Sequence, residues 1–270
     1  MDYSKYVELI QAGHYDEAVA FKNSFIPDVL YKYYCLDRRY KLNDKKLQCL
    51  QDAKIFLSEF DAFNDPFEGK FLIFDEQKLR EKGWDRSLIE SYYMHMASMF
   101  RIGCLSDTSE QNMPMWAYYA NNHEGFCVEY HIDEKQKKYI FPVAYEKERL
   151  YANSIVTHVV NGFYEMLENK TPLDEIPEDL SVYQQLMFLS FATKHKSWEH
   201  EKEYRIMNPF DNFFPMIPKK IFIGMNCKPK YRKRLQEIGN GFGDYCQVYQ
   251  MELERDSSNF DLSKRLLGKR

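Results

Sequence analysis

The sequence predicts an α+β protein, built as a single mixed-sheet domain with flanking helices. Hydrophobic residues make up 44% of the 270 residues and charged residues 29%, which is ordinary for a globular protein with a sizeable core. Short runs rich in aromatic and β-branched residues are interspersed with longer stretches whose apolar spacing is helical. Because no linker, repeat or low-complexity stretch interrupts residues 28–254, we predict one main domain there.

The first 27 residues predict a helical appendage. Apolar positions such as Tyr6, Ile10 and Ala18 recur with helical spacing on both sides of a polar break at Gly13 and His14. This pattern indicates two short helices forming a hairpin before Pro27. A single helical pair cannot bury its own apolar face, so we expect residues 1–27 to pack on the main domain.

The main domain is expected to contain strands at 29–34, 53–57, 101–105, 126–130, 140–145, 198–206, 220–224 and 246–253. Helices are expected at 43–51, 76–100, 114–121, 150–168, 179–195 and 229–239. Residues 255–270 form a polar C-terminal tail that we expect to be loosely held.

Composition excludes several classes of protein. The net charge is −4, so no overall basic field attracts nucleic acid, although a local patch remains open. The six cysteines form no C-x-x-C pair, which excludes the usual zinc-ligand spacing. Neither a signal peptide nor an apolar run long enough to span a bilayer occurs, which predicts a cytoplasmic protein with no membrane partner.

Residues 198–206 carry the most informative pattern. If they form a strand, Glu199, Glu201, Glu203 and Arg205 share one face, because side chains alternate along a strand. Three carboxylates in a row repel one another unless cations or a ligand relieve them. The segment is therefore a candidate polar site, the alternative being cross-strand ion pairing on a solvated face. The H-E-x-x-H spacing of a helical zinc site is missing, so no metal site is predicted.

Two further clusters precede it. Tyr31-Lys32-Tyr33 is either a charged edge strand or a clamp for a phosphate or carboxylate. The segment around Asn64 and Asp65 is a turn signal, because both residues favour turn-starting conformations and a proline follows.

A third cluster follows Pro114. On a helix, Trp116, Tyr119 and His123 fall close to one face. The stripe is either part of the core or a stacking surface for a base or nicotinamide ring, with His123 as donor or proton shuttle.

Five motifs stand in a fixed order along the chain: Leu30-Tyr31-Lys32-Tyr33, Phe63-Asn64-Asp65-Pro66-Phe67-Glu68, Cys104-Leu105-Ser106, Met115-Trp116 to Cys127, and Lys194 with Trp198 to Ile206. In that order they resemble a bacterial family, number 2971 among the domains of unknown function, over residues 29–253. That family name implies no activity.

The chain also resembles, more distantly, the ADP-ribosyltransferase fold. Members of that fold place an Arg or His on an early strand, a Ser, Thr or Tyr on a middle strand and a catalytic Glu on a late strand, often as Glu-x-Glu. The resemblance puts Lys32 or Tyr31 at the first position, Ser106 at the second, and Glu201 with Glu203 at the third. Lys32 departs from the pattern, being neither Arg nor His.

This second resemblance implies NAD as co-substrate. Glu203 would bond the ribose 2′-hydroxyl and stabilise positive charge on the ribose, while Glu201 would orient the acceptor. Lys32 would hold the pyrophosphate, and Tyr119 or Trp116 would stack on nicotinamide. The predicted catalytic residues are Glu203, Glu201 and His123, and the predicted cofactor-binding residues are Tyr31, Lys32, Asn64, Asp65, Ser106, Trp116, Tyr119 and Arg205.

Three functional hypotheses follow. The leading one is an ADP-ribosyltransferase-like enzyme that cleaves NAD and modifies a protein or nucleic-acid acceptor, as a toxin or phage-defence effector with an antitoxin or defence-system partner. The second is a nucleic-acid hydrolase that uses His123 with Glu201 and Glu203. The third is a non-catalytic module that binds a nucleotide or peptide in an aromatic cleft.

Overall fold

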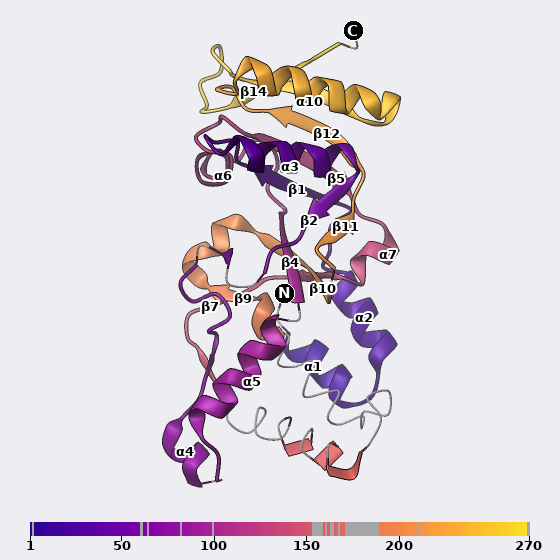
Figure 1. Cartoon of the computed structure of the whole chain (residues 1–270). Helices are drawn as coiled ribbons and strands as arrows, with labels where there is room; N and C mark the ends of the chain where they lie inside the picture. Colours follow the sequence, from indigo (N-terminus) through magenta and orange to yellow (C-terminus); the bar gives the residue numbers. More distant parts are fainter. Residues whose placement is uncertain are drawn as a thin grey trace.

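The computed structural model describes residues 1–268 apart from 2, 60–61, 64, 82, 99, 153–158, 160, 163–164, 167, 171–188 and 210, and gives only the backbone at 92, 96 and 209. It has the predicted α+β architecture. A large mixed sheet runs through the middle of the molecule, and helices flank it (Figure 1). The N-terminal helical pair lies toward one end of the molecule and the C-terminal strand at the other.

Within the described residues, eight strands form the main sheet in the order β14-β13-β12-β5-β1-β4-β10-β6. Their bounds are β1 Val29–Tyr34, β4 Phe100–Ser106, β5 Phe126–His131, β6 Ile140–Pro142, β10 Glu203–Pro209, β12 Pro218–Ile223, β13 Gln247–Leu253 and β14 Leu262–Leu266. β12 and β13 pair in parallel, and α10 (Pro229–Gly241) makes the long crossover that parallel neighbours require. Three two-stranded sheets join β11 Phe213–Pro215 to β2 Lys54–Phe56, β3 Leu72–Ile73 to β8 Leu150–Tyr151, and β7 Ala144–Glu146 to β9 Thr193–His195.

Helices cover the two faces of the sheet unequally. α3 (Tyr40–Gln51) and α10 enclose the largest apolar cluster, to which Leu30 contributes from β1 and Leu235 from α10. α6 (Met113–Tyr119) closes a smaller cluster around Trp116 on the other face. The remaining helices are α1 Ser4–Gln11, α2 Tyr15–Asn23, α4 Glu76–Glu81, α5 Arg86–Ser98, α7 Glu134–Lys137 and the 3₁₀ turns η2 Ser190–Ala192, η3 Lys196–Glu201 and η4 Gly243–Tyr245.

The N-terminal helices are anchored to the β6 edge of the sheet, as the need to bury their shared face predicts. The ammonium of Lys22 donates to the carbonyl oxygens of Lys137 and Ile140 at 2.6 and 2.7 Å. The hydroxyl of Tyr3 donates to the carbonyl of Pro142. A buried lysine satisfied by carbonyl oxygens fixes the docking geometry of the pair, because leaving it unpaired would be costly.

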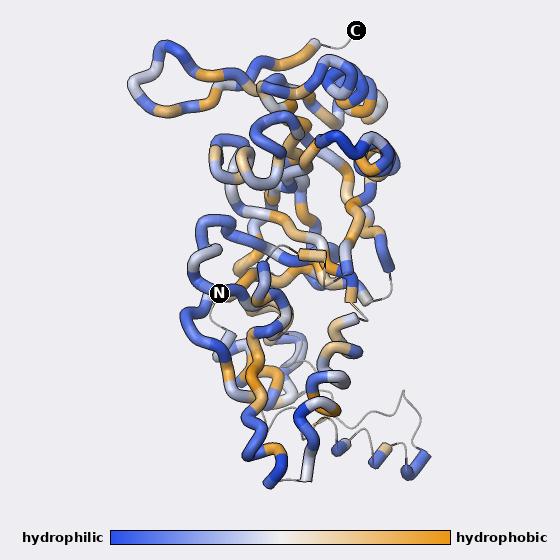
Figure 2. Tube along the Cα trace, turned by 60° about the vertical axis from the view of Figure 1, so that its left-hand side comes forward, coloured by the Kyte–Doolittle hydropathy of each residue, from blue (hydrophilic) through white to orange (hydrophobic). Residues whose placement is uncertain are grey.

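Apolar residues gather where the strands cross in the middle of the molecule, and hydrophilic residues predominate in the outward-projecting loops (Figure 2). Across the part of the chain that the structure describes, no helix combines the length and the apolarity that crossing a membrane demands.

Most predicted elements are present, including the strands at 29–34, 126–130 and 220–224 and the helix over α6. The expected strand at 140–145 is interrupted at Val143, where β6 ends and β7 begins. The expected strand at 198–206 is wrong in its first half. Residues Lys196–Glu201 form the 3₁₀ turn η3, and the strand begins only at Glu203.

Two other predictions need correction. The helices expected at 150–168 and 179–195 are contradicted at their outer ends, which form β8 and β9, while most of the residues between lie outside the described ones. The tail is not loosely held throughout, because β14 pairs antiparallel with β13 from Leu262 to Leu266. Leu262 holds this strand in place, because it is buried in the apolar cluster around Trp116 that α6 closes; we call this the α6 cluster.

Candidate active site

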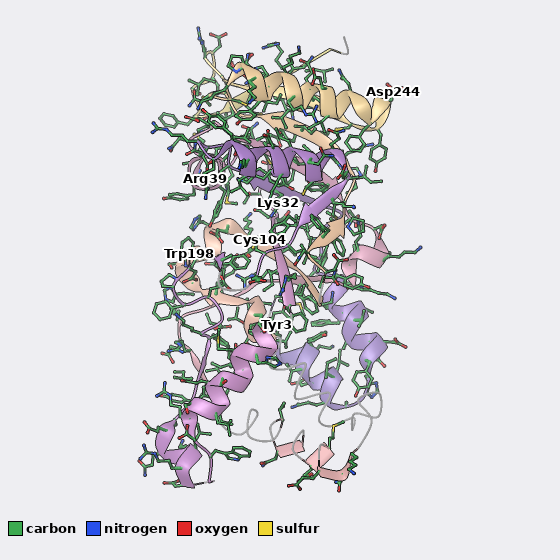
Figure 3. The ribbon with its side chains drawn as sticks, in the orientation of Figure 1. Tyr3, Lys32, Arg39, Cys104, Trp198 and Asp244 are labelled. Atoms are coloured by element: carbon green, nitrogen blue, oxygen red, sulfur yellow. The ribbon has the colours of Figure 1, made fainter. Side chains whose placement is uncertain are left out.

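A pocket opens where two central strands of the sheet separate. β1 pairs with β5 over six residues, whereas β1 and β4, both fully described, share the single partner pair Tyr31↔Ser106. Beyond that pair, the ammonium of Lys32 donates to the carbonyl oxygen of Cys104 at 2.9 Å. It thereby gives this backbone carbonyl a hydrogen-bond partner where β1 and β4 are no longer paired. Figure 3 shows Lys32 and Cys104 close together at the centre of the molecule.

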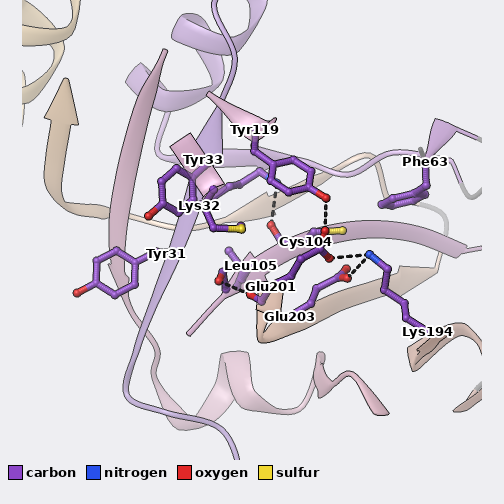
Figure 4. Close-up of a pocket in the computed structure, with 12 residues that line it drawn as sticks. Tyr31, Lys32, Tyr33, Phe63, Cys104, Leu105, Tyr119, Lys194, Glu201 and Glu203 are labelled. Atoms are coloured by element: carbon purple, nitrogen blue, oxygen red, sulfur yellow. Dashed lines mark hydrogen bonds and ion pairs between the residues drawn. The ribbon is translucent and has the colours of Figure 1, made fainter. Parts of the chain in front are cut away.

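The pocket has a volume of about 100 Å³. This is smaller than the roughly 300–1,000 Å³ that is usual for small-molecule sites, so the pocket takes in one part of a ligand and leaves the rest outside. Aromatic rings contribute to its walls and one end is charged (Figure 4). The lining residues are Tyr31, Lys32, Tyr33, Phe63, Cys104, Leu105, Ser106, Met115, Tyr119, Lys194, Glu201 and Glu203.

The chain reaches the pocket through a sharp change of direction at Lys202, whose φ of 44° is left-handed. This turn separates the carboxylates that a continuous strand would have stacked. Glu199 is exposed, whereas Glu201 and Glu203 are both buried and point to the same cation. The hydroxyl of Ser106 donates to the carbonyl of Glu201 at 2.5 Å and fixes the end of η3 on β4.

Lys194 is the cation that Glu201 and Glu203 share. Its ammonium nitrogen lies 2.7 Å from Glu201 Oε2 and 3.0 Å from Glu203 Oε2. Tyr119 donates from its hydroxyl to the other oxygen of Glu201. Figure 4 shows Lys194 bridging the two carboxylates, with Tyr119 reaching Glu201 from the opposite wall. A like-charge pair is therefore held close together by one cation and one neutral donor.

Arg205 closes the charged end of the pocket from behind. Its Nε lies 2.9 Å from Glu203 Oε1, and its two terminal nitrogens bind both oxygens of Glu68 at 2.5 and 2.9 Å. The guanidinium is fully buried, and it also donates to the carbonyl of Phe191. Fork-like pairing of this kind fixes the arginine rigidly and, through it, the position of Glu203.

The charges set the protonation of the groups at this end. Burial raises the pKa of Glu203, but the Arg205 and Lys194 charges outweigh burial and hold it at about 2. Burial alone would lower the pKa of Lys194, yet the Glu203 and Glu201 carboxylates raise it above its ordinary value. Glu203 and Lys194 are therefore both ionised at neutral pH.

The pKa values of Lys32 and Cys104 shift in opposite directions. Burial lowers the pKa of Lys32, and the opposing attraction of Cys104 and Glu203 only partly offsets this. Burial and the nearby Glu203 raise the pKa of the Cys104 thiol well above its ordinary value, so it remains a thiol beside that carboxylate. Lys32 thus carries a proton that an anionic ligand would help it to keep.

The structure brings six of the predicted site residues to this pocket: Tyr31, Lys32, Ser106, Tyr119, Glu201 and Glu203. Arg205 stands directly behind them. Tyr31 is held in place by Glu129, whose Oε2 accepts from the tyrosine hydroxyl at 3.1 Å.

Besides Arg205, three predicted site residues that the structure describes are not part of the pocket lining. Trp116 is fully buried in the α6 cluster, with its indole nitrogen donating to the carbonyl of Glu110. His123 stacks on Trp116 at 5.6 Å between ring centroids and lies outside the pocket wall. Asp65 accepts from the backbone nitrogen of Phe67 and lines a neighbouring hollow. Asn64 lies outside the described residues.

Sequence reasoning did not assign Lys194 or Glu68 to the site. Both residues lie in motifs that carry the family resemblance, and that resemblance was the signal in the sequence that could have identified them as site residues. Their partners, however, come from other elements: Glu68 binds an arginine 137 residues away, and Lys194 folds back from β9 onto β10. Within the described residues, no group of three or more His, Cys, Asp or Glu side chains is placed to hold a metal ion.

A family model described as "Protein of unknown function (DUF2971)" matches residues 115–206, about a third of the chain and less than the predicted 29–253. The matched stretch is similar to that family and carries the charged end of the pocket together with Tyr119. No curated protein and no solved structure matches the chain, so these comparisons lend no support to the ADP-ribosyltransferase resemblance.

Proposed function

We propose that the chain is an ADP-ribosyltransferase-like enzyme that cleaves NAD and transfers ADP-ribose to a protein or nucleic acid. The observation that carries the proposal is the state of Glu203, a buried carboxylate kept ionised by Arg205 and Lys194 at the end of an aromatic pocket. An anion fixed in a water-poor site stabilises positive charge that develops in a transition state.

The pocket suits a leaving group that departs without a proton. A carboxylate with a pKa of about 2 cannot act as a general acid at neutral pH, whereas most glycosidases require one. In NAD the nicotinamide ring nitrogen is already cationic. When its bond to ribose C1′ breaks, the electron pair returns to that nitrogen and neutral nicotinamide leaves. The acceptor then bonds C1′, and we assign its proton to Glu201.

Glu203 can take a substrate hydroxyl in place of its weakest partner. Arg205 donates to Oε1 at 2.9 Å and to Oε2 at 3.4 Å, Lys194 lies 3.0 Å from Oε2, and the Cys104 thiol is a weak donor to the same carboxylate. The ribose 2′-hydroxyl is the group we assign to the place of the thiol. Its bond to Glu203 strengthens as the ribose becomes positively charged, which is the differential binding that accelerates a reaction.

The other walls have the chemistry that the rest of NAD requires. Tyr119 and Tyr33 present aromatic rings to the pocket, and planar rings of this kind stack on a pyridinium. Lys32, which lies on the wall opposite Lys194, offers a cation to the pyrophosphate. In the cell we propose a cytoplasmic toxin or phage-defence effector, restrained by an antitoxin or defence-system partner.

The hydrolase hypothesis has less support, because it needs His123 beside Glu201 and Glu203. His123 lines no part of this pocket, and it packs on Trp116 instead. A module that binds NAD without cleaving it differs from the transferase only in turnover, so the same experiment separates the two, whereas a peptide-binding module predicts neither binding nor cleavage of NAD.

The test is to incubate the purified chain with NAD, alone and with protein or RNA and DNA from a bacterial extract, and to measure free nicotinamide by mass spectrometry. We expect nicotinamide and an equal amount of ADP-ribose, either free in water or attached to an acceptor. Saturable NAD binding without nicotinamide release would support a nucleotide-binding module, and neither binding nor release would refute the transferase and leave the peptide-binding module.

A further inference from the structure

The helices α3 and α10 lie side by side on one face of the main sheet and form a continuous outer surface there (Figure 1). The side-chain amide of Asn43 donates to the hydroxyl of Tyr231 at 3.0 Å, and Arg234 donates to the side-chain oxygen of Gln51 at 2.6 Å. α6 closes its cluster on the other face of the sheet. Both α3 and α10 are fully described, and neither contributes a residue to the lining of the pocket. Their surface is therefore separate from the proposed NAD site.

Positive charge dominates this surface. Residues 37–52 and 228–241 hold ten lysines and arginines but four carboxylates, whereas the protein as a whole carries a net charge of −4. Eight of these ten cations are exposed, against three of the four carboxylates. We call the eight exposed cations the basic surface: Arg38, Arg39, Lys41, Lys45, Lys228, Lys230, Lys233 and Arg234.

The protein's own carboxylates neutralise only part of the basic surface. Four of its cations lie near a carboxylate: Arg39 near Asp37, Lys228 at 3.7 Å from Glu124, and Lys233 and Arg234 each at 4.0 Å from the same Glu237. The other four form an ion pair with no residue that the structure describes: Arg38, Lys41, Lys45 and Lys230. The ammonium of Lys230 lies instead over the ring of Tyr40, 5.6 Å from its centroid. The surface therefore keeps an excess of positive charge for an anionic partner.

The polarity of the same surface distinguishes between anionic partners. Between Lys230 and Gly241, every exposed side chain of α10 is charged. On α3 the exposed large apolar side chains are Tyr40, at 58%, and Leu42, at 38%. A protein interface usually has an apolar core, and a helix bound to a membrane inserts an apolar face, and these two helices present neither. Interfaces with nucleic acid are polar and strongly basic, which is the character of this surface.

We propose that the basic surface binds the phosphate backbone of double-helical nucleic acid without reading its sequence. A duplex carries about one negative charge per 1.7 Å of its axis, and each phosphate that a lysine or arginine neutralises releases condensed counterions. Tyr40 is the exposed ring that α3 and α10 contribute, so the two helices offer unpaired bases little to stack on. The proposal does not depend on NAD cleavage, because it uses no residue of the pocket.

The test is the salt dependence of binding by the full chain, measured without NAD. Fluorescence anisotropy of labelled DNA duplexes of two unrelated sequences gives the affinity between about 50 and about 200 mM salt. We expect both sequences to bind alike. The four cations without a carboxylate partner predict a slope of about −4 for the logarithm of the binding constant against that of the salt concentration. Lys45→Gln and Lys230→Gln should each weaken binding to both sequences equally and make the slope shallower by about 1.

Lys78→Gln is the matched control, because it removes the same charge from an exposed lysine on α4, at the opposite end of the molecule from α10 (Figure 1). It should leave both the affinity and the slope unchanged. An equal change in slope for Lys78→Gln and Lys230→Gln would show that binding follows overall charge and would overturn the proposal. A marked preference for one of the two sequences would overturn it as well.

Two further ligands represent the other anionic partners. Poly-glutamate represents an acidic protein, and vesicles of phosphatidylcholine and phosphatidylserine represent an anionic membrane. We expect the duplex to bind more tightly than either. Tighter binding to poly-glutamate or to the vesicles, or no binding to the duplex at about 50 mM salt, would contradict a nucleic-acid partner.

Discussion

At the scale of residues, the site depends on a small set of buried charges that hold one another in place. Glu68, Glu201 and Glu203 face two cations, Lys194 and Arg205, and Lys32 on the opposite wall of the pocket is a third, so carboxylates and cations balance. Losing Lys194 or Arg205 would leave a buried carboxylate with too few partners.

Lys194→Met tests this dependence through stability. Removing the shared cation should lower the free energy of unfolding by about 3–5 kcal/mol, measured by urea denaturation, because two buried carboxylates lose their partner. Lys196→Met is the matched control two residues away, where the lysine is half-exposed and lies 3.9 Å from Glu199. That change should stay within about 1 kcal/mol. Equal effects of the two substitutions would contradict the buried network.

The pH dependence of NAD cleavage follows from two shifted pKa values. Glu203 has a depressed pKa, so its charge and its contribution to folding are complete above about pH 4.3 and are lost only as the pH falls through about 2. We therefore expect kcat/KM for NAD to show no acid limb between about pH 5 and 8. Because burial lowers the pKa of Lys32, the alkaline decline should begin below the ordinary lysine value of about 10.4. An acid limb near pH 6 would show a different essential group.

At the scale of elements, the site lies where β1 and β4 separate beyond a single partner pair. The helix α10 packs on β12 and β13 of the same sheet. α10 approaches β13 closely at Gly239, where a Cβ would lie 2.2 Å from a methyl of Val248. Two residues later Gly241 has open space at the same position. The helix can therefore lie flat on the sheet only with glycine at 239.

This pair of glycines gives a matched test. Gly239→Ala should destabilise the protein by about 1–3 kcal/mol, because an overpacked contact forces the helix away from β13. Gly241→Ala should be neutral or stabilise by up to about 1 kcal/mol, since alanine loses less entropy in a helix. Thermal unfolding followed by circular dichroism measures both, and a loss of stability at 241 equal to that at 239 would refute the packing.

The C-terminal strand makes a second prediction about elements. β14 covers the edge of β13 and buries Leu262, while Lys264 pairs with the buried carboxylate of Glu110. Ending the chain at Asp256 should expose that edge and lower the melting temperature, with increased aggregation seen by light scattering. A truncated chain as stable and monomeric as the full chain would mean that β14 adds nothing to the fold.

At the scale of the whole molecule, the sequence was sufficient for the sheet core and insufficient for the turn that carries the site. The strands from 29, 126 and 220 have β-branched and aromatic runs, and local preference agrees with tertiary packing there. In residues 198–206, alternating glutamates imitate a strand. Pairing of Lys194 with both Glu201 and Glu203 instead favours a 3₁₀ turn ended by left-handed Lys202.

The candidate site was predictable to the extent that its residues lie in ordered motifs. Lys32, Ser106, Tyr119, Glu201 and Glu203 were all named from the sequence and line one pocket. Long-range partners such as Glu68 are set by topology, which no local pattern reports. The stripe of Trp116 and His123 follows helical spacing, yet α6 ends at Tyr119 and His123 adopts a left-handed φ of 65°.

The most direct measurement is the rate of nicotinamide release from NAD by Glu203→Gln, beside the wild type and Glu110→Gln. Glu110 is a matched control, because it is equally buried and paired with a lysine but lines no part of the pocket. We expect Glu203→Gln to lose about 10²–10³-fold in rate, while Glu110→Gln stays near the wild type. A folded Glu203→Gln protein that releases nicotinamide at the wild-type rate would contradict the proposed role of this carboxylate.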